Sequence, residues 1–300
     1  MGRLEALLKA GAFVITAEIN PPKSANGGVV TRRAGVLKGY VDAANVTDSN
    51  RAQVAMSSLT AALFVRDAGV EPIVQMTGRD RNRIALQSDL LGGAALGLPN
   101  FVFMSGDDPK QGNHPEAVNV KDLDGLGILK AAVGMRDRHA FISGDEIRQP
   151  PVFFVGATAS PFAVPMEADV KKTVEKAAAG ADFLQTQPVF DAEGFGVWLR
   201  TIRAAGAAKV AIIAGVLILR SGDQAERMAK VPGVSVPAAI VERMRAAADA
   251  EREGVAIAVE TIAKLRAQGG AQGVHLYAIE WPEAIPLAVE RAGLFPRPEA

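Results

Sequence analysis

The sequence contains no cysteine, and this absence excludes several classes of protein. A chain of 300 residues without cysteine has no disulfide bond, no zinc site built on thiolates and no cysteine nucleophile. Histidine is scarce as well, because only His114, His139 and His275 are present and they lie far apart in the sequence. They predict no local metal cluster. We expect His275, which falls in a predicted strand without a partner cluster, to be a structural histidine.

An excess of charge of either sign is also missing. Lysine and arginine number 33, aspartate and glutamate number 33, and the formal net charge is zero. Nucleic acids and anionic membranes select for basic patches, so a neutral chain argues against both as the main partner. No apolar run reaches the ~18 residues of a membrane span, and Glu5 and Lys9 interrupt the N-terminal stretch, unlike a signal peptide. We therefore expect a soluble, cytoplasmic protein.

Apolar residues, in contrast, are abundant and occur in short runs. They make up 49% of the chain, which suffices for a large core. Eight runs are apolar on both faces, as are strands of a parallel sheet that helices cover. These predicted strands are residues 13–19, 41–47, 72–77, 100–105, 151–157, 181–187, 209–216 and 273–279.

Helical patterns separate the predicted strands. The clearest are residues 50–69, 79–97 and 170–180, together with 234–269, which is long enough for two helices. Asp169 is a candidate N-cap and Gly180 a candidate stop for one of them. This alternation, without a low-complexity linker, predicts one (β/α)8 TIM barrel, an α/β fold that comprises residues 1–300 as a single domain. The alternative is an open doubly wound sheet, for which a G-x-G-x-x-G pattern after the first strand is missing.

In a TIM barrel, chemistry takes place at the carboxyl ends of the strands. Strand ends are polar in many proteins because loops begin there, so one such residue carries little weight. The polar residues at the predicted ends are Glu18 and Asn20, Thr47 and Asp48, Gln75 and Thr77, Asp107 and Asp108, Thr158 and Ser160, Gln185 and Gln187, Arg220, Tyr277 and Glu280. The set includes carboxylates on several strands, and two of its members are unusual.

Glu18 stands inside an apolar strand, shortly before the rigid pair Pro21 and Pro22. Burial disfavours a charged carboxylate, so we expect the pKa of Glu18 to be raised and to suit a general acid near neutral pH. The alternative is a structural ion pair with a nearby cation such as Lys23. Gln187, in TQPVFD, ends a strand beside a proline. Its side chain is well placed for a planar, bidentate hydrogen bond to an amide-like ring edge.

The phrases at these strand ends resemble the methylenetetrahydrofolate reductases of the bacterial, single-domain type. The matching phrases are AEINPPK, NVTDS, QMTGRDRN, SGDDP, TQPVFD, AGVLILRS and GVHLYAIE, which follow the family's order over nearly the whole chain. The resemblance implies a barrel that binds FAD and reduces 5,10-methylenetetrahydrofolate to 5-methyltetrahydrofolate with NADH or NADPH. It also implies a place in one-carbon metabolism and methionine biosynthesis.

The resemblance also assigns roles to individual residues. Glu18 matches the family's acid, which protonates the folate and opens its imidazolidine ring. Asp107, after Gly106, matches an aspartate near the flavin and the pterin, where negative charge stabilises the developing cation. The substrate-binding residues are then Gln187 and Tyr277. The cofactor-binding residues are Thr47, Gln75, Asp107, Asp169, Lys176 and Ala181, with Asp169 at the ribityl chain or ribose and Lys176 at the diphosphate.

Several positions depart from the family pattern. Gln75 replaces a histidine, Ser105 an arginine, and residues 157–160 a tyrosine and a histidine, while Glu280 and Trp281 replace an asparagine and an arginine. Because these departures fall on cofactor and folate contacts, three functions stay open. They are an FAD-dependent reductase, an oxidoreductase that works without flavin or runs oxidatively, and a non-catalytic folate-binding or partner subunit. The sequence also leaves a homo-oligomer open.

Overall fold

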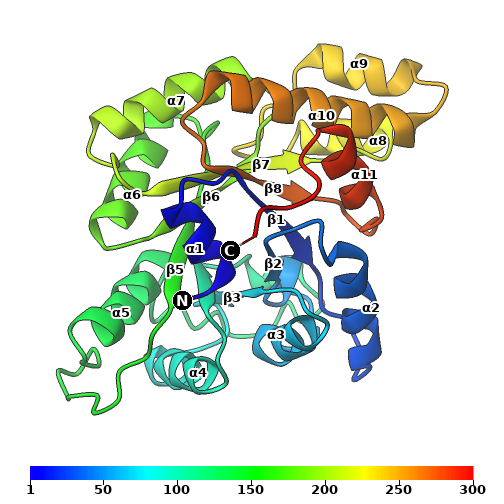
Figure 1. The fold of residues 1–300 in the computed structure, drawn as a ribbon. Coiled ribbons are helices and arrows are strands. Elements are labelled where there is room, and N and C mark those ends of the chain that lie inside the picture. Colours follow the sequence, from blue (N-terminus) through cyan, green and yellow to red (C-terminus); the bar gives the residue numbers. More distant parts are fainter. Residues whose placement is uncertain (300) are drawn as a thin grey trace.

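The computed structural model describes residues 1–299, and its centre is a closed barrel of parallel strands (Figure 1). Each strand pairs with the next along the chain, and β1 pairs with both β2 and β8, which closes the barrel. The strands are β1 (Val14–Ile19), β2 (Ala43–Val46), β3 (Pro72–Thr77), β4 (Asn100–Met104), β5 (Phe154–Ala159), β6 (Phe183–Pro188), β7 (Ala211–Leu217) and β8 (Gly273–Tyr277). The predicted (β/α)8 barrel is therefore confirmed, and every predicted strand coincides with an observed one.

Helices surround the strands, as Figure 1 shows. They are α1 (Arg3–Lys9), α2 (Gly27–Leu37), α3 (Ser58–Asp67), α4 (Arg83–Ala95), α5 (Gly125–Asp137), α6 (Met166–Ala178), α7 (Ala192–Ala204), α8 (Gly222–Met228), α9 (Ala238–Ala246), α10 (Ala250–Gln268) and α11 (Ala284–Arg291). Two 3-10 helices, η1 (Asn50–Ala52) and η2 (Pro109–Gln111), lie in the loops after β2 and β4. None of the described helices combines the length and apolarity that crossing a bilayer requires.

The helix predictions need two corrections. Residues 50–57 do not extend α3, because Arg51 and Ala52 have φ angles of 55° and 52° and the side chain of Ser57 caps the helix instead. Helix α6 begins after Pro165, so Asp169 lies within its first turn and is not its N-cap. The expectation of two helices in 234–269 is confirmed by α9 and α10.

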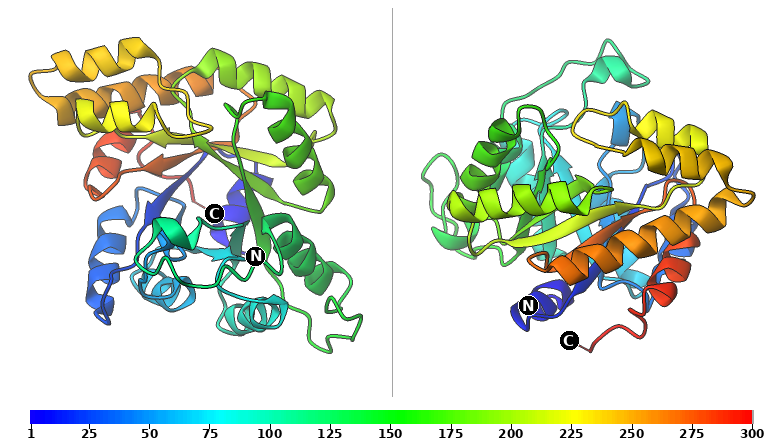
Figure 2. Two further views of the ribbon diagram at one scale, coloured as in Figure 1. Left: turned by 180° about the vertical axis from the view of Figure 1, so that it is seen from behind. Right: turned by 90° about the horizontal axis from the view of Figure 1, so that it is seen from above.

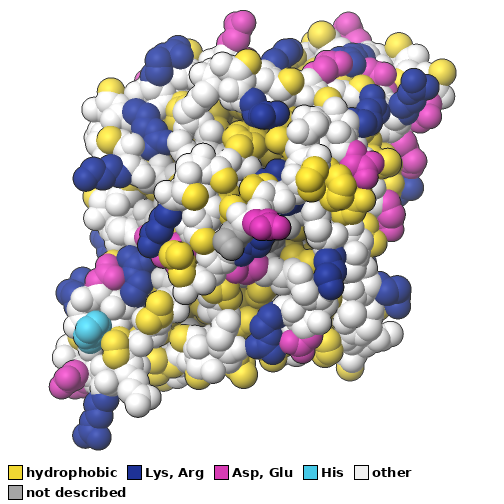
Figure 3. Space-filling model, viewed as in Figure 1, with side chains coloured by type: hydrophobic (Ala, Val, Ile, Leu, Met, Phe, Trp, Pro, Cys, Tyr) yellow, Lys and Arg dark blue, Asp and Glu magenta, His cyan; other side chains and the backbone are white. Residues whose placement is uncertain are grey.

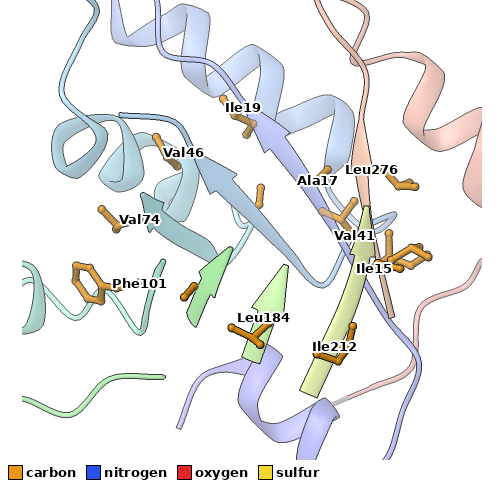
Figure 4. Close-up of a cluster of buried hydrophobic side chains, with 14 of the residues drawn as sticks. Ile15, Ala17, Ile19, Val41, Val46, Val74, Phe101, Leu184, Ile212 and Leu276 are labelled. Atoms are coloured by element: carbon orange, nitrogen blue, oxygen red, sulfur yellow. The ribbon is translucent and has the colours of Figure 1, made fainter. Parts of the chain in front are cut away.

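The strands separate an outer apolar layer from the barrel interior. Side chains along a strand point alternately to its two faces. One set packs between the barrel and the helices, where Figure 4 shows Ile15, Ala17, Ile19, Val46, Val74, Phe101, Leu184, Ile212 and Leu276. Burial of each large aliphatic side chain stabilises the fold by roughly 1.5–3 kcal/mol. The other set points into the barrel, and this set carries the polar residues of the strands.

The amino end of the barrel is closed by apolar packing. Leu4 and Leu7 of α1 cover an interior layer of the barrel, and Figure 1 shows α1 lying across this end beside both termini. The layer consists of Val14, Ala43, Ile73, Val102, Phe154, Phe183 and Ile213. Figure 3 shows basic and acidic side chains interspersed over the same face. Figure 2 (left) shows the molecule from behind, with the segment between β4 and α5 in front of the barrel. The carboxyl ends of the strands are thus the end at which a site can form.

Candidate active site

The mouth of the barrel gathers polar side chains from several strands. Glu18 of β1, Gln75 of β3 and Tyr277 of β8 lie close together: the side-chain amide of Gln75 lowers the pKa of Glu18, and burial, followed by the charge of Glu18, raises the pKa of Tyr277. Thr47 follows β2, which is paired with β1 through Glu18 and Asn45. These residues are distant in the sequence and meet at the face where TIM barrels carry their sites.

Glu18 has the properties expected of an acid that works near neutral pH. Burial raises the pKa of Glu18 to about 7, and hydrogen bonds from Asn20 and Gln75 oppose this increase. Lys23, the candidate partner, donates a hydrogen bond to Gln53 instead. Within residues 1–299, Glu18 forms no ion pair. The expected increase in pKa is thus confirmed, and the ion-pair alternative is wrong.

Asn20 joins the acid to the next strand. Its Nδ2 lies 3.5 Å from Oε1 of Glu18, and its Oδ1 accepts a hydrogen bond of 3.0 Å from the hydroxyl of Thr47. The resemblance assigns Thr47 to a flavin, whereas the structure places its hydroxyl on Asn20. The sequence did not single out Asn20 as a functional residue. The available signal was its spacing of two from Glu18, which puts both side chains on one face of the chain.

A layer of buried polar side chains lies within the barrel, closer to its amino end than Glu18. On β1 it includes Thr16, two residues before Glu18. Asn45 and Gln185 exchange two amide hydrogen bonds of 2.7 and 3.0 Å, and the hydroxyl of Thr16 lies 2.8 Å from Nδ1 of His275. Burial lowers the pKa of His275 to about 3, so this residue is neutral at physiological pH. His275 is therefore buried and hydrogen-bonded, as expected, and its ring contacts Tyr277 edge to face at 4.4 Å. The layer forms a fixed floor beneath the mouth.

Asp107 follows β4 on an exposed loop. Its Oδ2 accepts a hydrogen bond of 2.9 Å from the backbone N–H of Arg51, so the carboxylate holds the loops after β2 and β4 together. Gly106 has a φ of 88°, and a Cβ at this position would lie 3.0 Å from Cβ of Arg79. Asp108 accepts a hydrogen bond from the backbone N–H of Lys110 and begins the loop. No hydrogen bond within the described chain joins Asp107 to Glu18.

Three other predicted residues form no hydrogen bond to the acid within residues 1–299. Asp169 is buried, and its oxygens accept hydrogen bonds from the backbone N–H of Ser160 and the indole N–H of Trp198, both at 2.9 Å. Lys176 donates a hydrogen bond of 2.6 Å to the carbonyl of Thr158 in β5. Ala181 lies before the amino end of β6, so the length of this strand separates it from Gln187 at the opposite end. Asp169 and Lys176 therefore contact the carboxyl end of β5, and no contact joins these three residues to Glu18 within the described chain.

Lys176 could hold an anionic group such as a flavin diphosphate. Burial lowers the pKa of Lys176, and its ammonium forms no ion pair among residues 1–299. Only one of its three N–H donors is engaged, so the group can still bind an anion. Asp169 offers less to a ribityl chain or ribose, because three of the roughly four acceptor sites of its carboxylate already bind groups of the protein.

Comparisons of the sequence point to a single family. The family model described as methylenetetrahydrofolate reductase matches residues 3–293. A probable methylenetetrahydrofolate reductase (NADPH) of Caenorhabditis elegans is 25% identical, over 98% of this chain and 44% of that protein. Methylenetetrahydrofolate reductase 1 of Schizosaccharomyces pombe is 29% identical, over 47% of this chain and 24% of that protein. The chain thus spans less than half the length of these curated relatives.

Solved structures share the architecture. A Clostridium thermocellum protein that binds two copies of 5-methyl-5,6,7,8-tetrahydrofolic acid has a TM-score of 0.67 at 16% identity, with 98% of this chain and 100% of that chain covered. An F420-dependent secondary alcohol dehydrogenase has a TM-score of 0.57 at 10% identity, with 94% and 99% covered. At these identities the similarity shows the barrel fold alone.

Proposed function

Because the chain belongs to the methylenetetrahydrofolate reductase family, we propose that it reduces 5,10-methylenetetrahydrofolate to 5-methyltetrahydrofolate, with NADH or NADPH as donor and FAD as carrier. The observation that carries this proposal is Glu18. A carboxyl group at the barrel mouth with a pKa of about 7 and no cationic partner within the described chain can give and regain a proton near neutral pH. A folate-binding module without chemistry would not need such an acid.

Glu18 is the proposed general acid for the folate. Protonation of a ring nitrogen opens the imidazolidine ring and leaves an iminium cation that accepts hydride. The acid is present in its protonated form up to about pH 7, because burial disfavours its charged form. Asp107 supplies negative charge at the same end of the barrel, which would stabilise the cation as it forms.

Gln187 and Tyr277 are the proposed contacts to the substrate. Gln187 is half-buried, and no hydrogen bond to its side-chain amide occurs within residues 1–299, so both its oxygen and its nitrogen are available to the edge of a pterin. The hydroxyl of Tyr277 donates to the carbonyl of Thr186 at 3.1 Å, which fixes the ring as a wall of the mouth. A raised pKa keeps this tyrosine neutral.

The proposed cofactor shell consists of Lys176 at the diphosphate, with Thr47, Gln75 and Asp107 nearer the reacting ring. FAD, when bound, supplies reversible hydride transfer between the nicotinamide and the folate. The roles that the resemblance gives to Asp169 and Ala181 would have to be indirect, since one is engaged within the protein and the other lies at the far end of β6.

The test separates the two halves of the reaction. Purified protein that contains FAD absorbs at about 450 nm, as oxidised flavins do. In the variant Glu18→Gln, NAD(P)H should still reduce the flavin, while turnover of 5,10-methylenetetrahydrofolate is lost, because the acid acts on the folate alone. Loss of both half-reactions would contradict the assigned role.

A second candidate reaction omits the flavin. The hydrogen bonds that Asp169 forms within the protein favour it, because they leave fewer acceptor sites for a ribityl chain. A colourless protein that oxidises NAD(P)H in the presence of 5,10-methylenetetrahydrofolate would establish direct hydride transfer. If the assay proceeds only from 5-methyltetrahydrofolate, the enzyme works in the oxidative direction. Absence of both flavin and turnover would favour a folate-binding subunit.

A further inference from the structure

We propose that Asn20 is a positioning residue: its side-chain amide, oriented by Thr47 and Asn50, directs an N–H group at the carboxyl group of Glu18. The inference deepens the proposed function and rests on it, because a positioned carboxyl group matters only where that group transfers a proton. It adds a residue that the family resemblance does not assign, and it gives Thr47 a role that does not require a flavin.

The hydrogen bonds around Asn20 define how its amide lies. Oδ1 accepts from the hydroxyl of Thr47 at 3.0 Å and from Nδ2 of Asn50 at 3.3 Å. An amide oxygen only accepts and an amide nitrogen only donates, so these two donors turn Nδ2 towards Oε1 of Glu18, 3.5 Å away. The reversed amide would place its oxygen against the carboxylate, and it would require the hydroxyl of Thr47 to accept and the amide of Asn50 to turn as well. Beside a charged Glu18 the observed orientation is therefore preferred.

The backbone of Asn20 is held as firmly as its side chain. The residue precedes Pro21, and a residue before proline is restricted to extended conformations. The guanidinium of Arg33 in α2 donates to the carbonyl of Asn20, and the carbonyl of Pro22 accepts the backbone N–H of Met56 at 2.9 Å. Because Glu18 and Asn20 are two residues apart on an extended chain, their side chains share one face. The amide thus has little freedom to leave the acid.

The charged and titratable groups on the elements next to Glu18 are neutral or are engaged elsewhere. From β8, His275 is neutral because burial lowers its pKa to about 3, and Tyr277 is neutral because its pKa is raised. Beyond β2, Asp48 accepts hydrogen bonds from Thr77 and Arg81. Lys23, in the loop after β1, donates a hydrogen bond to Gln53. Arg33, in α2, donates a hydrogen bond to the carbonyl of Asn20. A titration of this site near pH 7 therefore reports on Glu18.

The experiment follows the Glu18 carboxyl group directly. In protein with ¹³C at the glutamate carboxyl carbons, the Glu18 signal is the one absent from Glu18→Gln. An N–H donor stabilises the charged carboxylate and lowers its pKa, so Asn20→Ala should raise the titration midpoint, by about half to one pH unit for one hydrogen bond. Thr47→Val should raise it in the same direction, and Thr47→Ser, which keeps the hydroxyl, should restore the original midpoint. An unchanged midpoint in Asn20→Ala overturns the proposal.

The double variant tests whether Thr47 acts through Asn20. If it does, Asn20→Ala combined with Thr47→Val has the same midpoint as Asn20→Ala alone, whereas additive shifts overturn the proposed connection. The pH profile of turnover separates this inference from the proposed function. Its alkaline limb should move to higher pH together with the midpoint. A midpoint that moves without the pH profile supports the positioning by Asn20 and removes Glu18 as the acid of the reaction.

Discussion

The half-buried Glu18 should have a measurable effect on the stability of the fold. The pKa of Glu18 rises from 4.5 to about 7 on folding, chiefly because burial removes its carboxylate from water. Since the folded pKa is the higher one, the stabilising contribution of Glu18 is fully present below about pH 4.5 and is lost as the pH rises to about 7. At 1.36 kcal/mol per pH unit, the free energy of unfolding falls by about 3 kcal/mol across this window, as an upper value.

The comparison that isolates this effect is between the wild-type protein and Glu18→Gln. The variant carries a neutral isostere, so it should gain stability relative to wild type as the pH rises. Urea unfolding at a series of pH values between 5 and 8 gives the difference in the free energy of unfolding at each pH. Glu280→Gln, at an exposed position beyond β8, is the matched control. If the difference between Glu18→Gln and wild type is the same at both ends of this range, the argument from burial is refuted.

Three other substitutions test neighbouring parts of the site. Asp107→Asn should slow the folate half-reaction through loss of negative charge and leave flavin reduction by NAD(P)H in place; an unchanged folate half-reaction would remove Asp107 from the mechanism. Lys176→Met should weaken FAD binding about tenfold or more in equilibrium dialysis, whereas Lys176→Arg should keep most of it, because the guanidinium also binds phosphate. Gly106→Ala should lower the free energy of unfolding by roughly 1–2 kcal/mol, since a φ of 88° disfavours any side chain; urea unfolding that matches wild type would contradict this.

The sequence predicted the architecture because strand patterns are local. A run that is apolar on both faces marks a covered parallel strand, and alternation with helices leaves few arrangements other than a barrel. The same reasoning placed Glu18 among apolar residues and predicted the direction of its pKa shift. Where a local signal was ambiguous, the prediction from the sequence was wrong. Residues 50–57 have helical spacing, yet left-handed conformations at Arg51 and Ala52 interrupt the helix, and the loop after β4 holds this segment in place.

Which side chains meet was decided only by the tertiary structure. Nothing near Asp169 in the sequence shows that Trp198 and Ser160 occupy its oxygens, or that β6 keeps Ala181 away from the mouth. Nothing near Asn20 in the sequence shows that its partner is Thr47, which follows the neighbouring strand β2. Composition and periodicity determine which face of an element is buried, because burial depends on a residue's own chemistry and its near neighbours. Hydrogen-bond partners depend on strand order and register, which arise only when the barrel closes.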